Sequence, residues 1–432
     1  MKFPGRRKIK HYFPVNADNR FDRESMTFGH TNTYVCGIDQ NIVDIYAHVD
    51  DSILADFGLA KAASQLMDNE TANQLYHYLS FQKLIDNQYA GGTIGNTLHN
   101  YSILADDRSV QFGVMSQNIR VGDYSYGYLC NTSSKVDLTQ LQPVDGPIGR
   151  CYTLITPDGE RTFGISPGLM NNLSPEYISE DIIKGSSALV LCAYTLGDES
   201  LPIYQATIKA ASLAKKHDVP VLLTLGTYSL VTAIRERLSQ FISDYVTLVA
   251  MNEEEALALT EQSDPLLASE AALNLTDMVL LTAGPEGLYI SGYTEKTLAR
   301  ETDNPLVSAG ITDYNRYEFS RPLLKKDCVE PLKVYSHISP YMGGPDKIKN
   351  TNGAGDGALA AVLHDLAANR FHRQVLPTSS KHKKPWLTYS SFSQVCKYAN
   401  RVSYEVLAQS SPRLSRALPE QEDSLEESYW ER

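Results

Sequence analysis

A glycine-rich turn opens a helix at Asn350-Thr351-Asn352-Gly353-Ala354-Gly355-Asp356-Gly357, and an apolar period continues over residues 358–366. Gly353 and Gly355 can adopt backbone angles that other residues avoid, so successive amide N–H groups can converge beside the unpaired donors of the helix start. Such a cradle binds a negatively charged oxygen. Asp356 would lie beside the bound anion, where phosphoryl transfer needs a group that accepts a proton from the attacking hydroxyl. The stretch therefore predicts a kinase centre.

The same residues also have a purely structural interpretation. Gly-Ala-Gly is common in strand-to-helix turns, and the helix dipole favours an Asp in the first turn without any chemistry. A second phosphate-binding or sugar-binding element is needed to choose between the catalytic and the structural interpretation. One occurs at residues 90–100, where Gly91 and Gly92 allow close backbone approach and Asn96 offers a donor and an acceptor to a vicinal diol. Its alternative is a tight turn with a buried polar network.

The two elements together resemble the ribokinase family, also called the PfkB carbohydrate kinases. Members carry Gly-Gly-x-x-x-Asn near the N-terminus and Thr-x-Gly-Ala-Gly-Asp near the C-terminus, in the order seen here. Further segments resemble family landmarks in family order: residues 37–45, 252–255, 282–287 and 398–400. Two positions depart from the pattern. Asn350 stands where the family usually has Asp, and Gln40 stands where adenosine kinases usually have Asn.

The resemblance implies a role for each matching residue. Asp356 is the expected catalytic base, and Asp44 and Asn96 are expected to hold the ribose 2′- and 3′-hydroxyls. The other implied residues form four sets: an anion hole of Gly353, Ala354 and Gly355; nucleoside contacts from Gln40, Gly91, Gly92 and Thr93; ATP contacts from Thr282, Gly284, Gly287, Asn352 and Asn400; and Asn252 with Glu255, which act on magnesium through water. Apart from the family, Asp44 is typical of a strand-end turn, and Asn252 with Glu255 is typical of a helix cap.

Within the family, the run from Asp44 to Leu59 and the variant Thr351-Asn352-Gly353 resemble nucleoside kinases more than sugar kinases. The similarity covers nearly the whole chain. It implies transfer of the γ-phosphate of ATP, with Mg²⁺, to the 5′-hydroxyl of a purine ribonucleoside, converting inosine or guanosine to IMP or GMP in purine salvage. The purine preference rests on resemblance alone, and dependence on a monovalent cation such as K⁺ is left open.

Other classes of function fit the sequence less well. A sugar or sugar-phosphate kinase shares the fold and the catalytic centre and is the runner-up. An NAD-dependent oxidoreductase is disfavoured because residues 91–95 do not fit Gly-x-Gly-x-x-Gly, and a P-loop enzyme because its motif is missing from the sequence. A binding protein built on an inactive kinase conflicts with the intact element from Gly353 to Asp356.

The electrostatics of the helix start give a further expectation. The positive end of a helix dipole lowers a carboxylate pKa, so Asp356 is expected to be a weak base. A loose transition state tolerates a weak base, because positioning and charge stabilisation dominate phosphoryl transfer.

The composition of the chain limits the classes of partner that the protein can bind. The net charge of −12 argues against nucleic acid, and there is neither an apolar run of about 18 residues for a membrane nor an N-terminal secretory signal. Six scattered cysteines without Cys-x-x-Cys spacing make a zinc site or a disulfide framework improbable. We expect a cytoplasmic enzyme whose partners are a nucleoside and ATP, with no nucleic acid and no membrane; a homodimer is left open.

The middle of the chain repeats one unit. Short apolar runs at residues 188–192, 219–224, 246–250 and 278–282 are separated by turns or by helices such as 202–216 and 229–243. This alternation predicts an α/β fold, and with the resemblance a ribokinase-like three-layer α/β/α sandwich whose central sheet is mainly parallel. Residues 151–165 predict a β-hairpin with an Asp158-Gly159 turn, part of a small β-sheet lid over the sugar.

These observations divide the chain into expected parts. Residues 1–35 form an N-terminal arm, and residues 36–410 form the kinase domain. Parts of 40–60 and 110–170 contribute the lid, insertions lie near 293–330 and 371–384, and residues 411–432 form an acidic tail.

Overall fold

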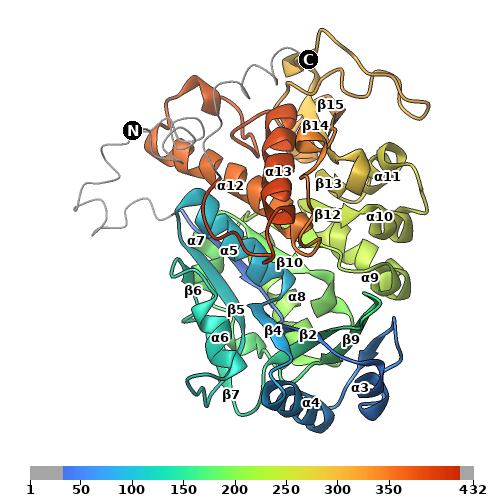
Figure 1. Ribbon diagram of the computed structural model, residues 1–432. Coiled ribbons are helices and arrows are strands. Elements are labelled where there is room, and N and C mark those ends of the chain that lie inside the picture. The colour runs from blue at the N-terminus through green and yellow to red at the C-terminus, as the bar shows by residue number, and fades with distance from the viewer. Residues whose placement is uncertain (1–32, 419–432) are drawn as a thin grey trace, which may run out of the picture.

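The central element of the fold is a ten-stranded sheet, seen in a computed structural model that describes residues 33–418 (Figure 1). Residues 1–32 of the expected arm and 419–432 of the expected tail lie outside the described residues. The strand order is β15-β14-β13-β12-β11-β10-β1-β5-β6, with β7 also paired to β5. The bounds are β1 Val35–Ile38, β5 Ser109–Ser116, β6 Val136–Asp137, β7 Leu141–Val144, β10 Leu189–Cys192, β11 Val221–Thr224, β12 Leu248–Asn252, β13 Met278–Thr282, β14 Leu288–Glu295 and β15 Pro331–Ile338.

The four apolar runs form strands of this sheet, as predicted, and the structure shows that they are neighbours. β10, β11, β12 and β13 pair in parallel, with Leu189 beside Val221 and Val249 beside Val279. β14 and β15 are antiparallel and complete one edge. This pairing confirms the prediction of a mainly parallel sheet. Its strands are continuously apolar because helices cover both faces of such a sheet.

Helices cover both faces of this sheet. One face packs against α7 Glu180–Gly185, α8 Pro202–Lys216, α9 Tyr228–Tyr245, α10 Glu253–Thr260 and α11 Pro265–Ala272. The other packs against α5 Thr93–Ala105, α12 Ala354–Val375 and α13 Phe392–Leu407 (Figure 1). The two separate apolar clusters establish the α/β/α sandwich. None of the helices within residues 33–418 has the length and apolar character needed to cross a membrane.

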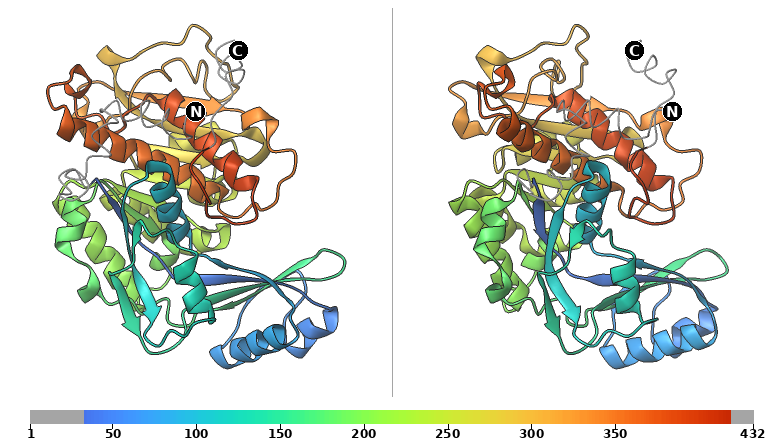
Figure 2. Two further views of the ribbon diagram at one scale, coloured as in Figure 1. Left: turned by 60° about the vertical axis from the view of Figure 1, so that its left-hand side comes forward. Right: turned by 90° about the vertical axis from the view of Figure 1, so that its left-hand side faces the viewer.

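A second sheet of five strands projects from one end of the sandwich (Figure 2). Its order is β3-β9-β8-β2-β4, with bounds β2 Ile42–His48, β3 Ser64–Leu66, β4 Ile85–Ala90, β8 Gly149–Ile155 and β9 Arg161–Ser166. β8 and β9 form the predicted hairpin, and Gly159 in its turn has φ 83°. Helices α3 Asp51–Asp56 and α4 Asn69–Phe81 pack on one face of this small sheet, hereafter the lid.

Two strands of the lid, β3 and β4, lie in regions where the sequence pattern does not predict a strand. β3 has three residues, and β4 has the polar sequence Ile-Asp-Asn-Gln-Tyr-Ala, so neither shows an apolar pattern. Conversely, β5 to β7, within the expected lid region 110–170, pair with the central sheet. The lid is therefore assembled by pairing with β2 and β9 more than by local propensity.

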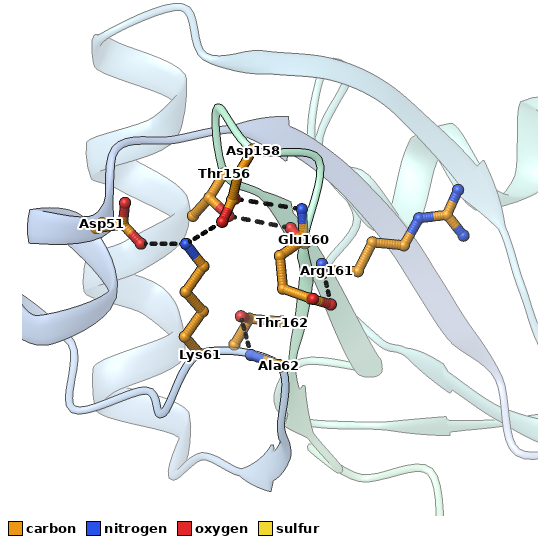
Figure 3. A network of polar contacts seen from close by, with 8 residues as sticks. All are labelled: Asp51, Lys61, Ala62, Thr156, Asp158, Glu160, Arg161 and Thr162. Atoms are coloured by element: carbon orange, nitrogen blue, oxygen red, sulfur yellow. Dashed lines mark hydrogen bonds and ion pairs between the residues drawn. The ribbon is translucent and has the colours of Figure 1, made fainter.

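Polar contacts hold the hairpin turn of the lid beside α3 (Figure 3). Lys61 Nζ lies 2.8 Å from an oxygen of Asp51 and 2.7 Å from an oxygen of Asp158. The Ala62 amide donates to Thr162 Oγ1 at 3.1 Å, whereas the Arg161 side chain points away from the cluster. Exposed ion pairs are worth at most about 1 kcal/mol, so these contacts orient the turn more than they stabilise the fold.

The two expected insertions pack against each other. The segment 293–330 begins inside β14 and runs to the start of β15, and the segment 371–384 begins in the last turn of α12 and continues beyond its end. Arg321 of the first segment donates to the Lys381 carbonyl of the second at 2.9 Å and to Asn369 Oδ1 at 3.0 Å. They lie at the side of the sandwich away from the lid and contribute no side chain to the cleft described next.

Candidate active site

A cleft of about 1140 Å³ lies between the carboxyl ends of the parallel strands and the lid. Ligands of open α/β sheets bind at this edge, because helix N-termini and strand ends converge there. Every residue that the sequence predicted for the site lines this cleft, except Gly91. Gly91 lies just behind the wall, where its amide donates to the Ile42 carbonyl at 2.9 Å. Segments separated by most of the chain therefore meet at one place.

The turn before α12 forms one end of the cleft. Gly353 is the N-cap of α12 and has φ 83°, a left-handed conformation that favours glycine. A Cβ atom on Gly353 would lie 2.5 Å from Pro412 Cβ, so the turn also needs a residue without a side chain. At Gly355 a Cβ atom would meet nothing within 4 Å, so the backbone is open to the cleft. The amides of this first turn lack intrahelical acceptors and can receive an anion.

Asp356 lies in the first turn of α12, and Asn96 Nδ2 donates to its Oδ2 at 3.0 Å. Burial raises the pKa of Asp356 to about 7; Asn96 and Arg413 oppose this rise, and Asp44 and Glu255 add to it. The expectation of a lowered pKa is wrong for this structure. Removal of the carboxylate from water outweighs the helix dipole, which was the only effect behind the expected lowering.

This pKa gives a prediction for the pH dependence of the reaction. A base with a pKa near 7 is mostly protonated at pH 6 and cannot accept a proton, so kcat/KM for the nucleoside is expected to fall below pH 7, to fall more steeply below about 6 as Asp44 is also protonated, and to level off above 7. The profile is measured at saturating magnesium-ATP between pH 5 and 9. Burial also raises the pKa of Asp39 to about 7, so Asp39→Asn is the control. A flat profile, or a limb that disappears in Asp39→Asn, would contradict this assignment.

The turn at Gly91 and Gly92 packs against two carboxylates. A Cβ atom on Gly91 would lie 2.6 Å from Asp44 Oδ2, and one on Gly92, where φ is 91°, would lie 2.1 Å from Asp39 Oδ2. The positive φ favours glycine at residue 92, and a side chain at residue 91 would push against the Asp44 carboxylate. Asp44 is partly buried in the cleft wall, and burial raises its pKa to about 6, with Arg413 acting against this rise.

Gln40 and Asn171 add amide groups to the same region. Gln40 Nε2 donates to Asn171 Oδ1 at 2.5 Å. Asn171 had no signal in the sequence, because it lies in the irregular segment after β9. The contact joins the chain just before β2, where it enters the lid, to the chain after β9, where it leaves the lid.

The far end of the cleft carries the residues expected to act on ATP and magnesium. Asn252 and Glu255 form a reciprocal capping box at the start of α10, so the structural interpretation of this pair holds, and both also line the cleft. Asn400 Nδ2 donates to the Ser339 carbonyl at 2.8 Å, and Gly287 has φ 102° in the turn after β13. Within residues 33–418 no three His, Cys, Asp or Glu side chains gather into a direct metal site. The oxygen ligands of Asn252 and Glu255 fit a magnesium ion that keeps its waters.

Arg413, which the sequence did not indicate, lies buried behind the cleft wall and contacts Asn96. It belongs to residues 411–418, which were assigned to the acidic tail, yet Arg413, Leu414 and Leu418 are buried. Its guanidinium Nε donates to Asn96 Oδ1 at 3.0 Å. The residue carries no local motif, and it lies 317 positions from its partner in the sequence. A sequence pattern has no means of indicating such a contact.

The sandwich, the projecting lid and the glycine turn at α12 together define a ribokinase-like small-molecule kinase. The family model described as pfkB family carbohydrate kinase matches residues 120–304. The chain is 58% identical over 434 aligned residues to guanosine-inosine kinase of Escherichia coli strain K12, and equally to that of Escherichia coli O157:H7, with 100% of each chain covered. The protein therefore belongs to the PfkB family of kinases and is a phosphotransferase.

Solved structures agree on the fold. Adenosine kinase from Sinorhizobium meliloti is 21% identical with a TM-score of 0.63, covering 93% of this chain and 100% of that one. Anopheles gambiae adenosine kinase in complex with P1,P4-di(adenosine-5) tetraphosphate is 16% identical with a TM-score of 0.60, covering 87% of this chain and 96% of that one.

Proposed function

We propose that this enzyme transfers the γ-phosphate of ATP to the 5′-hydroxyl of inosine and guanosine, forming IMP or GMP and ADP. One observation carries the proposal. The hydrogen bond from Asn96 to Asp356 joins the sugar element to the phosphate element across 260 positions of sequence, with Asp44 lining the same cleft. The full-length similarity to guanosine-inosine kinases supports the purine assignment.

Each residue of the site has its own role in the proposed reaction. Asp44 and Asn96 hold the ribose hydroxyls, with Gln40 and Thr93 beside them. The 5′-oxygen attacks the γ-phosphorus and the bond to the β-phosphate oxygen breaks, so that ADP leaves while Asp356 takes the hydroxyl proton. Amides of the turn at residues 353–355 receive the charge spread over the phosphoryl oxygens.

The nucleotide lies along the part of the cleft lined by Thr282, Gly284, Gly287, Asn352 and Asn400. When bound with ATP, magnesium would neutralise phosphate charge, and Asn252 and Glu255 would hold it through water.

The lid excludes water from the transfer. Asn352 Nδ2 donates to the hydroxyl of Tyr46 at 3.1 Å, which links strand β2 of the lid directly to the catalytic turn. ATP in an open site would be lost to hydrolysis, so contact between lid and turn favours transfer to the nucleoside. Tyr46 showed no signal in the sequence, because its partner is brought to it only by the fold.

A substrate panel tests the proposal. Guanosine, inosine, adenosine, cytidine, ribose and fructose 6-phosphate are each assayed for magnesium-dependent ADP release, in K⁺ and again in Na⁺, with the product phosphate located by ³¹P NMR. We expect guanosine and inosine to give the highest kcat/KM and the phosphate to be on the 5′-oxygen. Preference for ribose or fructose 6-phosphate would instead assign a sugar or sugar-phosphate kinase.

A further inference from the structure

The chain beyond α13 folds back between the two halves of the candidate active site. On one side, Asn350 Nδ2 donates to the Ser410 carbonyl at 2.9 Å, and Pro412 packs against Gly353 of the catalytic turn. On the other side, Asn100 of α5 accepts from the Leu414 amide at 2.7 Å and donates to the Pro412 carbonyl at 3.1 Å. The segment 410–414 is thus held by both the catalytic turn and the helix that carries Asn96.

Arg413 projects from this segment into the interior, with only 4% of its surface exposed. Besides Asn96 Oδ1, it donates to Thr132 Oγ1 at 2.7 Å and to the Gly91 carbonyl at 3.1 Å. Its guanidinium carbon lies 5.2 Å from the ring centroid of Tyr128. A Cβ atom on Gly95 would lie 2.8 Å from Arg413 Nη2, so α5 has room for the guanidinium only because glycine occupies that position.

These contacts fix the orientation of the Asn96 amide. A guanidinium only donates, so Asn96 must turn its oxygen toward Arg413. Its NH₂ group then faces Asp356 Oδ2, which accepts a hydrogen bond as a carboxylate. With the Gly91 carbonyl bound as well, one side chain holds both the glycine turn and the asparagine of the sugar element.

We propose that Arg413 is a positioning residue for phosphoryl transfer, acting through Asn96 on Asp356 and through the Gly91 carbonyl on the ribose cradle. The proposal rests on the function proposed above. It makes the segment after α13 part of the active site, although that segment carries none of the motifs that marked the site.

The charge of Arg413 has a second consequence. The hydrogen bonds from its guanidinium go to neutral oxygens, so its positive charge acts on the carboxylates nearby. It lowers the pKa of Asp39, Asp44 and Asp356, against the rise caused by burial. The titratable and charged groups that face Asp356 are Asp39 before β2, Asp44 on β2, Cys192 at the end of β10, Tyr194 after it, Glu255 on α10 and Arg413.

The test compares two variants with a matched control. Arg413→Met removes the charge and keeps most of the volume, and Arg413→Lys keeps the charge but not the planar set of donors. Arg416→Met, the control, changes an exposed arginine just beyond the segment. Each is assayed for kcat, for KM of nucleoside and of ATP, for the pH profile and for thermal unfolding. The Asp356 pKa of the substrate-free protein is measured by carboxyl ¹³C NMR, with Asp356→Asn to assign the signal.

We expect Arg413→Lys to unfold near the wild-type temperature and to lose about tenfold in kcat/KM for the nucleoside with its pH profile unchanged, because a displaced Asn96 misorients the substrate. Arg413→Met should lose about 100-fold and move the acidic limb and the NMR pKa upward by about one unit. The KM for ATP and all properties of Arg416→Met should stay close to wild type.

Two results would overturn the proposal. One is a folded Arg413→Lys with nucleoside kcat/KM equal to wild type. The other is an Asp356 pKa that does not move in Arg413→Met, and this second result is readable without any turnover. A wild-type enzyme that phosphorylates no nucleoside would contradict the proposed function instead, and the NMR measurement would then decide about Arg413 alone.

Discussion

Asp356→Asn is expected to lose about 10²–10⁴-fold in kcat while still binding the nucleoside, because general-base catalysis is typically worth that much. Asparagine has the same shape as aspartate, and its oxygen can still accept the hydrogen bond from Asn96 that the carboxylate accepts at 3.0 Å. It cannot take up the proton of the 5′-hydroxyl. The measurement is a pair of numbers: turnover with saturating magnesium-ATP, and nucleoside affinity by calorimetry.

Asp365→Asn is the matched control for this experiment. Asp365 lies on the same helix, is fully buried and accepts from the Ser390 amide at 3.0 Å, but it does not line the cleft. The control variant should show any cost of an Asp-to-Asn change in α12 as a lower unfolding temperature, with kcat preserved in the folded fraction. Turnover of Asp356→Asn at the wild-type rate would reject the base assignment.

Asp44→Ala is expected to raise KM for the nucleoside and to lower kcat, with a combined loss of about 10²–10⁴-fold in kcat/KM. Hydrogen bonds to a charged group are each worth about 1.5–3 kcal/mol, and the carboxylate is expected to accept two from the ribose. A nucleoside that is no longer anchored at its ribose also places its 5′-oxygen less accurately, which lowers kcat.

A ribose analogue separates this role from a structural one. For the wild type, kcat/KM should be much lower with 2′-deoxyguanosine than with guanosine. For Asp44→Ala the two values should be similar, because the partner of the missing hydroxyl is already gone. Asp50→Ala is the control, since Asp50 lies beyond the same strand, is exposed, and makes no side-chain cap to α3. Equal discrimination in Asp44→Ala and wild type would place the 2′-hydroxyl contact elsewhere.

Much of the fold could be predicted from residues that act locally. The apolar run of β13 is only five residues long, and its composition alone indicates that it is buried. The Asp158-Gly159 turn of the lid hairpin needs only a positive φ at glycine. The same holds for the two glycine turns of the site, where backbone freedom is a property of the residue itself.

The tertiary structure decided what depends on distant neighbours. β4 is polar in sequence and becomes a lid strand because β2 pairs with it. Arg413 has no motif, and it enters the site because the chain after α13 turns back toward α5.

The pKa of Asp356 shows the physical reason for this division. Backbone angles and apolar periods are set within a few residues, so the sequence by itself determined the glycine turns, the parallel sheet and the family of kinases. Desolvation and Coulomb interactions act through space, and Asn96 and Arg413 come from segments far from residue 356. Only the folded chain brings them together, so it alone decided that this carboxylate has a raised pKa and which arginine faces it.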